Sequence, residues 1–282
     1  MTRAEIARVK ADGRYDLLVI TVAKLETGGA GDTARARYRQ GAVTVVGGVP
    51  LPNPESTGNL LVGTIIGRWL ASHADVLGGT LLDLGCGNRP YEPWYESLVD
   101  KVIAMDPAPG ATPNVIALAD AVPLRDNCVD VVLCTEVFEH VDRIEHAVAE
   151  MVRVMKPGAS TLVTVPFLYP THEAPYDFHR LTHFGLRSIV ERHGLEVQDM
   201  GAQGGPLTVA TNWTFRALRA AIDTVGRRLG SSSPLSLRVP FRWLTITPQQ
   251  LSLALRSGVH SRLTRASRLA STGYMVLARK PF

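Results

Sequence analysis

Leu81-Leu82-Asp83-Leu84-Gly85-Cys86-Gly87-Asn88 is the stretch that decides the fold of this chain. An apolar run that contains one acidic residue leads directly into two glycines one residue apart. Glycines at the end of a strand permit a tight turn and let a ligand lie against the main chain. Pro90 stands where the G-x-G-x-x-G pattern requires its third glycine, which serves helix packing beneath a bound pyrophosphate. The stretch therefore predicts a strand followed by a binding loop suited to a nucleoside.

Short apolar runs alternate with amphipathic helical patterns along most of the chain. The strand-like runs are Thr80–Leu84, Lys101–Met105, Val115–Leu118, Val129–Cys134, Ser160–Val165, Leu195–Asp199 and Gly273–Arg279. The clearest helical pattern runs from Ile144 to Met155, with apolar residues every three or four positions, and Lys156-Pro157-Gly158 ends it. This alternation predicts an α/β fold: a doubly wound, Rossmann-like and mostly parallel sheet with helices on both faces.

Two regions break this rhythm and suggest three parts. Residues 1–57 hold two strand-like runs, 15–22 and 42–46, which we expect to form an N-terminal extension resembling a hairpin. Residues 204–272 are rich in Arg, Leu and Ser, and we expect a helical insertion there. Helical patterns occupy 58–74, 212–229 and 248–257. Residues 58–203 and 273–282 then form the main domain.

The composition is that of an ordinary globular protein. The chain has 282 residues, of which 45% are hydrophobic and 20% charged. These values exclude collagen, coiled coil and disorder. Cys86, Cys128 and Cys134 show neither disulfide nor zinc spacing, so a reduced, cytoplasmic setting is expected. No secretory signal is visible, and no apolar run approaches the roughly 20 residues that span a membrane.

Charge is unevenly distributed. The formal net charge is +4, yet residues 41–200 contain ten basic and twenty acidic side chains. Residues 201–272 contain ten basic side chains and one acidic side chain. A localised basic segment favours an anionic partner, so we expect one beside the insertion.

Further acidic residues follow the later strands. Asp106 ends the second strand, where a carboxylate can accept hydrogen bonds from ribose hydroxyls. Asp120 follows the third strand, and a loop acid that forms an Asx-turn is an alternative reading of it. The fourth strand leads into Thr135-Glu136-Val137-Phe138-Glu139-His140-Val141.

In this order the motifs resemble those of class I S-adenosylmethionine-dependent methyltransferases, particularly the small-molecule branch called methyltransferase type 11. The resemblance covers about residues 78–200 and the last strand, which it implies to be antiparallel. It implies S-adenosyl-L-methionine as cofactor, bound by Asp83, Leu84, Gly85, Cys86, Gly87, Asp106, Pro107, Asp120, Ala121 and Thr135. Asp106 would bind the ribose and Asp120 the adenine. The Asn88-Arg89-Pro90 segment departs from the family's commoner glycine-rich continuation.

The loops after the fourth and fifth strands are expected to bind the acceptor. Methyl transfer is an in-line displacement that mainly requires alignment, and an alcohol acceptor also requires a base. Histidine suits that role near pH 7, and His172 is the first choice. The remaining catalytic candidates are His140, His179, Glu136 and Asp177, and the candidates for acceptor contact are Tyr169, Tyr176 and Arg180.

Structural readings exist for the same residues. His140 is as well explained by a backbone hydrogen bond that supports a helix entry. Arg180 is equally suited to pair with Glu173 or Asp177, and Tyr176 to pack. His172, Glu173 and Asp177 match no strong metal-binding pattern, so no metal is expected.

The resulting prediction is O-methylation of a small molecule such as a sugar, glycolipid or secondary metabolite. No motif for methylating nucleic-acid bases follows the fourth strand, so no nucleic-acid partner is expected. An apolar stripe in the insertion, flanked by Arg216, Arg219, Arg227 and Arg228, favours an anionic or lipid-linked acceptor and peripheral membrane contact. The alternatives are an NAD(P)-dependent oxidoreductase and a non-catalytic, membrane-associated binding protein.

Overall fold

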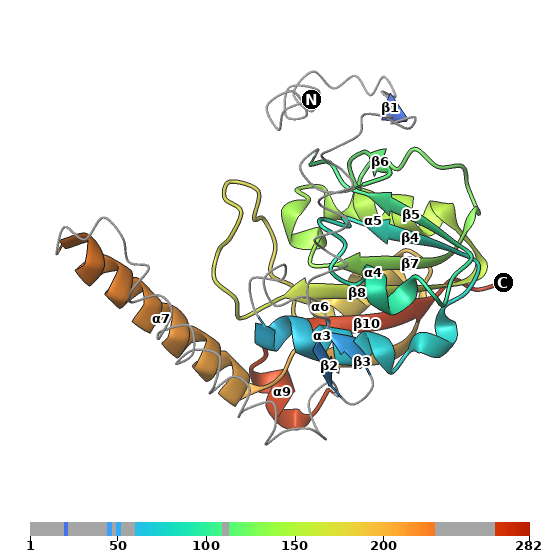
Figure 1. The fold of residues 1–282 in the computed structure, drawn as a ribbon. Coiled ribbons are helices and arrows are strands. Elements are labelled where there is room, and N and C mark those ends of the chain that lie inside the picture. The colour runs from blue at the N-terminus through green and yellow to red at the C-terminus, as the bar shows by residue number, and fades with distance from the viewer. Residues whose placement is uncertain (1–19, 22–43, 47–48, 52–59, 109–112, 229–262) are drawn as a thin grey trace.

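A single large sheet forms the centre of the molecule (Figure 1). The computed structural model describes residues 20–21, 44–46, 49–51, 60–108, 113–228 and 263–282. The sheet has eight strands in the order β1-β6-β5-β4-β7-β8-β10-β9. Their bounds are β1 Ile20–Thr21, β4 Thr80–Leu84, β5 Lys101–Met105, β6 Val115–Ile116, β7 Val129–Thr135, β8 Met155–Pro166, β9 Glu196–Ala202 and β10 Gly273–Arg279.

Strand directions confirm the predicted fold class. Neighbouring strands from β6 to β8 run parallel, whereas β10 runs antiparallel to both β8 and β9. Parallel strands bring their carboxyl ends to one edge, so the loops after β4, β5, β7 and β8 gather there. This edge holds the residues predicted to carry the chemistry.

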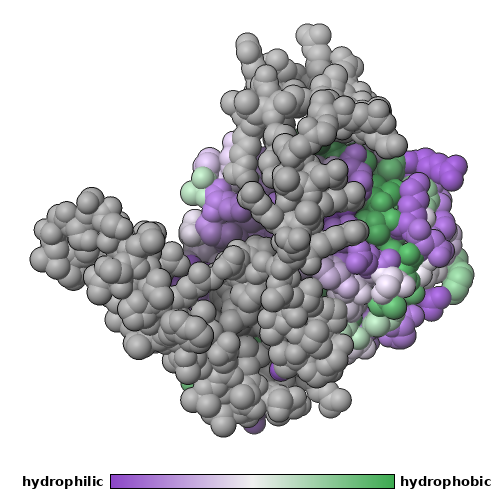
Figure 2. All heavy atoms as spheres, viewed as in Figure 1, coloured by the Kyte–Doolittle hydropathy of each residue, from purple (hydrophilic) through white to green (hydrophobic). Residues whose placement is uncertain are grey.

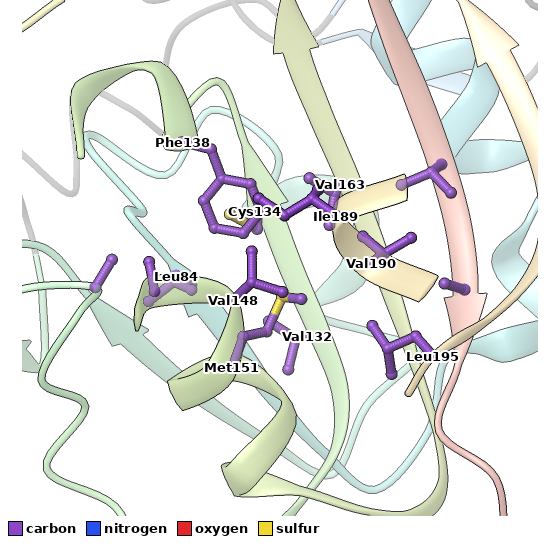
Figure 3. Packing of buried hydrophobic residues seen from close by; sticks show 14 of the residues in the cluster. Leu84, Val132, Cys134, Phe138, Val148, Met151, Val163, Ile189, Val190 and Leu195 are labelled. Carbon is purple, nitrogen blue, oxygen red and sulfur yellow. The ribbon is translucent and has the colours of Figure 1, made fainter. Parts of the chain in front are cut away.

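Helices cover both faces of the sheet, and each face has its own apolar cluster. Helices α3 (Leu60–Ala71) and α4 (Glu92–Tyr95) pack on one face, and α5 (Ile144–Val154) and α6 (His183–Arg192) on the other. Because side chains alternate along a strand, Leu81 joins the first cluster and Leu82 the second. Figure 3 shows the second cluster, with Val148 of α5 and Ile189 of α6 directed toward the strands.

The N-terminal strands pair differently from the prediction. Strand β1 pairs antiparallel with β6 at the edge of the large sheet. Strand β2 (Thr44–Val46) instead pairs with β3 (Val49–Leu51) in a separate two-stranded sheet. Among the described residues of runs 15–22 and 42–46, residues 20–21 and 44–46 do not pair with each other as expected. Residues 44–46 pair with residues 49–51, from which only two residues separate them. This pairing closes a much shorter loop than the expected one.

The region before the last strand contains helix α7 (Pro206–Arg228), which extends away from the sheet in Figure 1. It begins six residues earlier than predicted, at Pro206, a residue that favours the first helical turn. A short helix, α9 (Arg265–Leu269), is capped by Thr264. The predicted helix at 248–257 lies outside the described residues.

No helix in the described ranges is both long and apolar enough to span a membrane. On the face seen in Figure 2, hydrophilic residues of the described chain surround a band of hydrophobic ones.

Candidate active site

The loop after β4 turns tightly at the two glycines. Gly85 has φ +71° and Gly87 φ +50°, the left-handed region that favours glycine. A Cβ on Gly85 would lie 2.3 Å from Val137 Cγ2, whereas a Cβ on Gly87 would meet nothing within 4 Å. Gly85 thus permits close packing against the exit of β7. Gly87 leaves open space beside the loop.

Asp106 joins the loops after β4 and β5. Its Oδ2 accepts from the amide of Gly87 at 2.9 Å, and its Oδ1 accepts from the amide of Ala108 at 2.7 Å. A carboxylate has about four lone-pair sites, so each oxygen retains acceptor capacity toward a ligand. Pro107, another predicted cofactor contact, lies between Asp106 and Ala108 in the chain.

Asp83 lies beneath the glycine turn in a buried pair that the sequence did not reveal. Its side chain is 3% exposed, and its Oδ2 accepts from Tyr95 Oη at 2.7 Å. Burial raises the pKa of Asp83 to about 7, although the Tyr95 hydrogen bond opposes that shift. Burial likewise raises the pKa of the Cys86 thiol. Leu84 is fully buried, so its contribution to a ligand site is through its main chain.

Arg89 organises the segment that departs from the glycine-rich pattern. It is 5% exposed and has φ 51°. Its guanidinium donates to Glu92 Oε1 and to Asn114 Oδ1, each at 2.9 Å. A side chain therefore anchors this end of the loop to the segment before β6.

Asp120 and Ala121 lie in a turn after β6. Asp120 is 8% exposed, and its Oδ2 accepts from Arg143 Nη2 at 2.8 Å. The amide of Ala121 donates to the carbonyl of Leu118 at 3.1 Å. Their predicted contact with a ligand stays a prediction.

Three side chains meet on the acceptor side, and we call them the His–Glu cluster: Glu139, His140 and His172. The Nε2 atoms of both histidines lie 3.7 Å from Glu139 Oε1. The two imidazole rings lie 4.8 Å apart, centroid to centroid, in an edge-on arrangement. Glu139 is 1% exposed, and burial raises the pKa of its carboxyl well above the usual range. No role for Glu139 was predicted from the sequence.

The segment between β8 and α6, residues 167–182, supplies His172; we call it the strap. Asp177 holds it together by accepting from both guanidinium nitrogens of Arg180, with Nη2 at 2.6 Å from Oδ2, and from the amide of His172 at 2.9 Å. Arg180 holds the pKa of Asp177 at about 2. Arg180 therefore pairs with Asp177, one of the two alternatives to acceptor contact that the sequence offered.

Other predicted residues lie around the cluster. Glu136, at φ +54°, follows Thr135, the last residue of β7, and accepts hydrogen bonds from Thr164 Oγ1 and Gln203 Nε2, both 2.7 Å. His179 Nε2 lies 3.2 Å from the carbonyl of Asp142, so the strap directs this ring away from the cluster.

Helix α7 contacts the strap at Leu168, whose carbonyl accepts from Trp213 Nε1 at 3.3 Å, and at Tyr169. Arg216 of α7 donates to Tyr169 Oη, and its guanidinium carbon lies 4.6 Å from the centroid of that ring. Tyr169 in turn lies 5.4 Å from the ring of His172, centroid to centroid. Side-chain contacts therefore run from α7 to the cluster.

The sequence of this region matches a known family. A family model described as a methyltransferase domain matches residues 82–163, which run from β4 into β8. Residues 82–163 belong to this methyltransferase-domain family. The methyltransferase resemblance drawn from the motifs is thereby confirmed, and S-adenosylmethionine is the cofactor of this family.

Proteins similar to this chain occur in mycobacteria. An uncharacterized methyltransferase of Mycobacterium leprae (strain TN) is 30% identical over 168 residues, 51% of this chain and 61% of that protein. One of Mycobacterium tuberculosis (strain H37Rv) is 32% identical over 146 residues, 45% of this chain and 56% of that protein. The chain thus spans about three fifths of the length of these curated relatives. A putative sarcosine dimethylglycine methyltransferase structure from Galdieria sulphuraria has TM-score 0.49 at 16% identity, covering 89% of this chain and 98% of that one.

Proposed function

We propose that this protein transfers a methyl group from S-adenosylmethionine to a hydroxyl of a small-molecule acceptor. The observation that carries the proposal is the geometry at Gly87. Its missing Cβ faces open space, and its amide is fixed by the carboxylate of Asp106. A nucleoside ligand needs such a main-chain surface next to an acceptor for its ribose hydroxyls.

The cofactor fits the residues that line this edge. Asp106 is suited to bind the ribose, and the turn at Gly85–Gly87 to lie against the methionine portion. When bound, S-adenosylmethionine would supply a methyl group on a sulfonium, and an acceptor oxygen could take this methyl group by in-line displacement of the sulfur. The chain's own contribution is to align that oxygen and exclude water.

A hydroxyl acceptor must also lose its proton, and the His–Glu cluster is suited to assist. His172 was the first candidate for a base. Desolvation and the neighbouring His140 lower the pKa of His172, which favours a neutral imidazole at pH 7. The cluster follows β7, the strand next to β4, so it flanks the proposed cofactor site.

The acceptor is proposed to be a sugar, glycolipid or secondary metabolite that carries an anionic or lipid-linked group. Arg216 supports this because it lies beside Tyr169 on the strap. The side chains of Arg219, Arg227 and Arg228 lie outside the described part of the chain. Peripheral membrane contact through the insertion remains part of this proposal.

The proposal is tested by calorimetric titration of the full chain with S-adenosylmethionine and, separately, with NADH and NADPH. We expect binding of the first alone. Candidate acceptors are then incubated with isotopically labelled cofactor and analysed by mass spectrometry for added methyl groups. Binding of the nicotinamide nucleotides alone would favour the oxidoreductase alternative, and no binding of either would favour a non-catalytic protein.

A further inference from the structure

The His–Glu cluster places three hydrogen-bond acceptors around one point with no donor between them. Neither carboxylate oxygen of Glu139 has a hydrogen-bond partner among the described residues, although the side chain is only 1% exposed. An unpartnered carboxylate at this depth is strongly disfavoured unless something positive accompanies it. Both histidine Nε2 atoms lie 3.7 Å from Glu139 Oε1, a separation too long for a hydrogen bond.

The opposite ring nitrogens decide the tautomer of each histidine. Nδ1 of His140 lies 2.6 Å from the carbonyl oxygen of Tyr176, which can only accept, so Nδ1 carries the hydrogen. Nδ1 of His172 lies 3.3 Å from the carbonyl oxygen of Pro170 and 3.4 Å from Asp177 Oδ2. In a neutral ring the hydrogen then resides on Nδ1 in both cases. Each Nε2 presents a lone pair toward Glu139.

This arrangement matches the surroundings of metal-binding histidines. Such a histidine usually donates its second N–H to a carbonyl or carboxylate, which fixes both the ring and the lone pair. Here His140 has the carbonyl of Tyr176, and His172 has Asp177 together with a carbonyl. Asp177 is itself fixed by Arg180. The supporting contacts are therefore in place for two ligands from different loops.

The spacing of the donor atoms is also suitable. One donor atom from each of Glu139, His140 and His172 lies within 4.8 Å of the other two. For three atoms separated by 3.7, 3.7 and at most 4.8 Å, the equidistant point lies at most about 2.4 Å from each, against about 2.0–2.1 Å for zinc–nitrogen bonds. Small side-chain shifts would close that difference.

We propose that Glu139, His140 and His172 form a binding site for a divalent transition-metal cation. Two imidazoles and one carboxylate favour zinc or ferrous iron over magnesium, which prefers oxygen ligands alone. Three protein ligands leave further coordination positions open, as in catalytic sites. The expectation of no metal, drawn from His172, Glu173 and Asp177, considered a different set of residues.

The role of the cation rests on the proposed function. A cation at the cluster would lower the pKa of an acceptor hydroxyl bound to it, so that the hydroxyl proton passes to water. The acceptor oxygen then forms a bond to the methyl carbon while the carbon–sulfur bond breaks, and the electron pair remains on sulfur. His172 then acts as a ligand, which refines its expected role as a free base.

The site is tested by binding alone, without cofactor or acceptor. The full chain is stripped with a chelator, dialysed and titrated with zinc sulfate against a chromophoric chelator. We expect one zinc ion per chain. Glu139→Gln, His140→Ala and His172→Ala should each weaken zinc binding at least 100-fold, and Asp177→Asn by about 10-fold to 100-fold through loss of ligand support. His179→Ala, which removes a strap histidine outside the cluster, should not change it.

A second measurement uses the wild-type protein alone, so it remains informative if the variants fail to fold. Zinc-edge X-ray absorption of the loaded wild-type protein should show nitrogen and oxygen neighbours with imidazole scattering. Wild-type protein that takes up no stoichiometric zinc or ferrous iron would overturn the proposal, as would unchanged zinc affinity in folded Glu139→Gln and His172→Ala. Cofactor titration of the same samples separates the two proposals, because zinc binding without S-adenosylmethionine binding would refute the proposed function and keep the metal site.

Discussion

The amide of Gly87 donates to Asp106 Oδ2 at 2.9 Å, so the loops after two neighbouring strands are joined by the acid expected to bind a ribose. Asp106→Ala should therefore weaken S-adenosylmethionine binding through both a lost ligand contact and a loosened loop. We expect the dissociation constant to rise about 10-fold to 100-fold, equivalent to about 1.4–2.8 kcal/mol. Titration calorimetry measures this change. Asp100→Ala, at the opposite end of β5, is the matched control, and an equal loss in both variants would contradict the assignment.

The two glycines of the loop should respond differently to alanine. Gly85→Ala adds a left-handed backbone penalty of about 1–2 kcal/mol and a contact with Val137 that costs about 1–3 kcal/mol more. Gly87→Ala carries only the backbone penalty, because its Cβ would meet no protein atom within 4 Å. Urea unfolding should show the larger loss for Gly85→Ala, and calorimetry should show weakened cofactor binding for Gly87→Ala. Unchanged affinity in a folded Gly87→Ala protein would argue against a ligand beside this residue.

The pKa of Asp83, raised to about 7 by burial, makes stability depend on pH. Between about pH 4 and pH 7 the folded chain binds more protons at Asp83 than the unfolded chain, so the free energy of unfolding falls as pH rises. The slope from one group is at most about 1.4 kcal/mol per pH unit. Asp83→Asn should remove this part of the slope in urea unfolding at several pH values. Tyr95→Phe should extend the fall to higher pH, since it removes a hydrogen bond to the carboxylate and so raises the folded-state pKa of Asp83 further.

Asp177 should matter more than an ordinary surface ion pair. Its side chain is 3% exposed and accepts from Arg180 and from the amide of His172. Asp177→Ala should lower the free energy of unfolding by about 2–3 kcal/mol and increase hydrogen exchange in the strap. Arg187→Ala, which breaks an exposed pair with Glu191, should change stability by less than about 1 kcal/mol. Equal effects in the two variants would show that the strap does not depend on Asp177.

Arg216 links the basic insertion to the strap, so its replacement tests the anionic acceptor. Arg216→Ser should raise the KM for an anionic acceptor about 10-fold, as expected for loss of one charged hydrogen bond, and leave cofactor affinity unchanged. Tyr169→Phe removes the hydroxyl that Arg216 contacts but keeps the positive charge. A KM that rises equally for anionic and neutral acceptors would assign Arg216 to strap support alone.

The sequence was sufficient for the central strands and for the glycine loop because both depend on local patterns. Strands β4, β5 and β10 have the predicted bounds, and Asp106 lies where the strand order requires it. Tyr95 could not be found in this way, since its contact with Asp83 depends on how α4 packs beneath β4.

The acceptor side shows the same limit. Glu139 and His140 are adjacent in sequence, but burial of the carboxylate and approach of His172 follow from the path of the strap. His179 was a further candidate beside His172, and the same path carries its ring to Asp142. The exposed or buried state of a histidine in a long loop is set by tertiary contacts rather than by spacing.

Strand β10 lies between β8 and β9 in the sheet, although it is synthesised long after both of them. Strand β9 ends at Ala202, and its partner in the sheet begins only at Gly273, after the whole insertion. During synthesis, β8 has an unpaired edge and β9 has no strand to join until that point. Exposed edges of this kind invite pairing with other chains. The high contact order of this closure predicts slow folding, with a late step that is sensitive to the length and composition of the insertion.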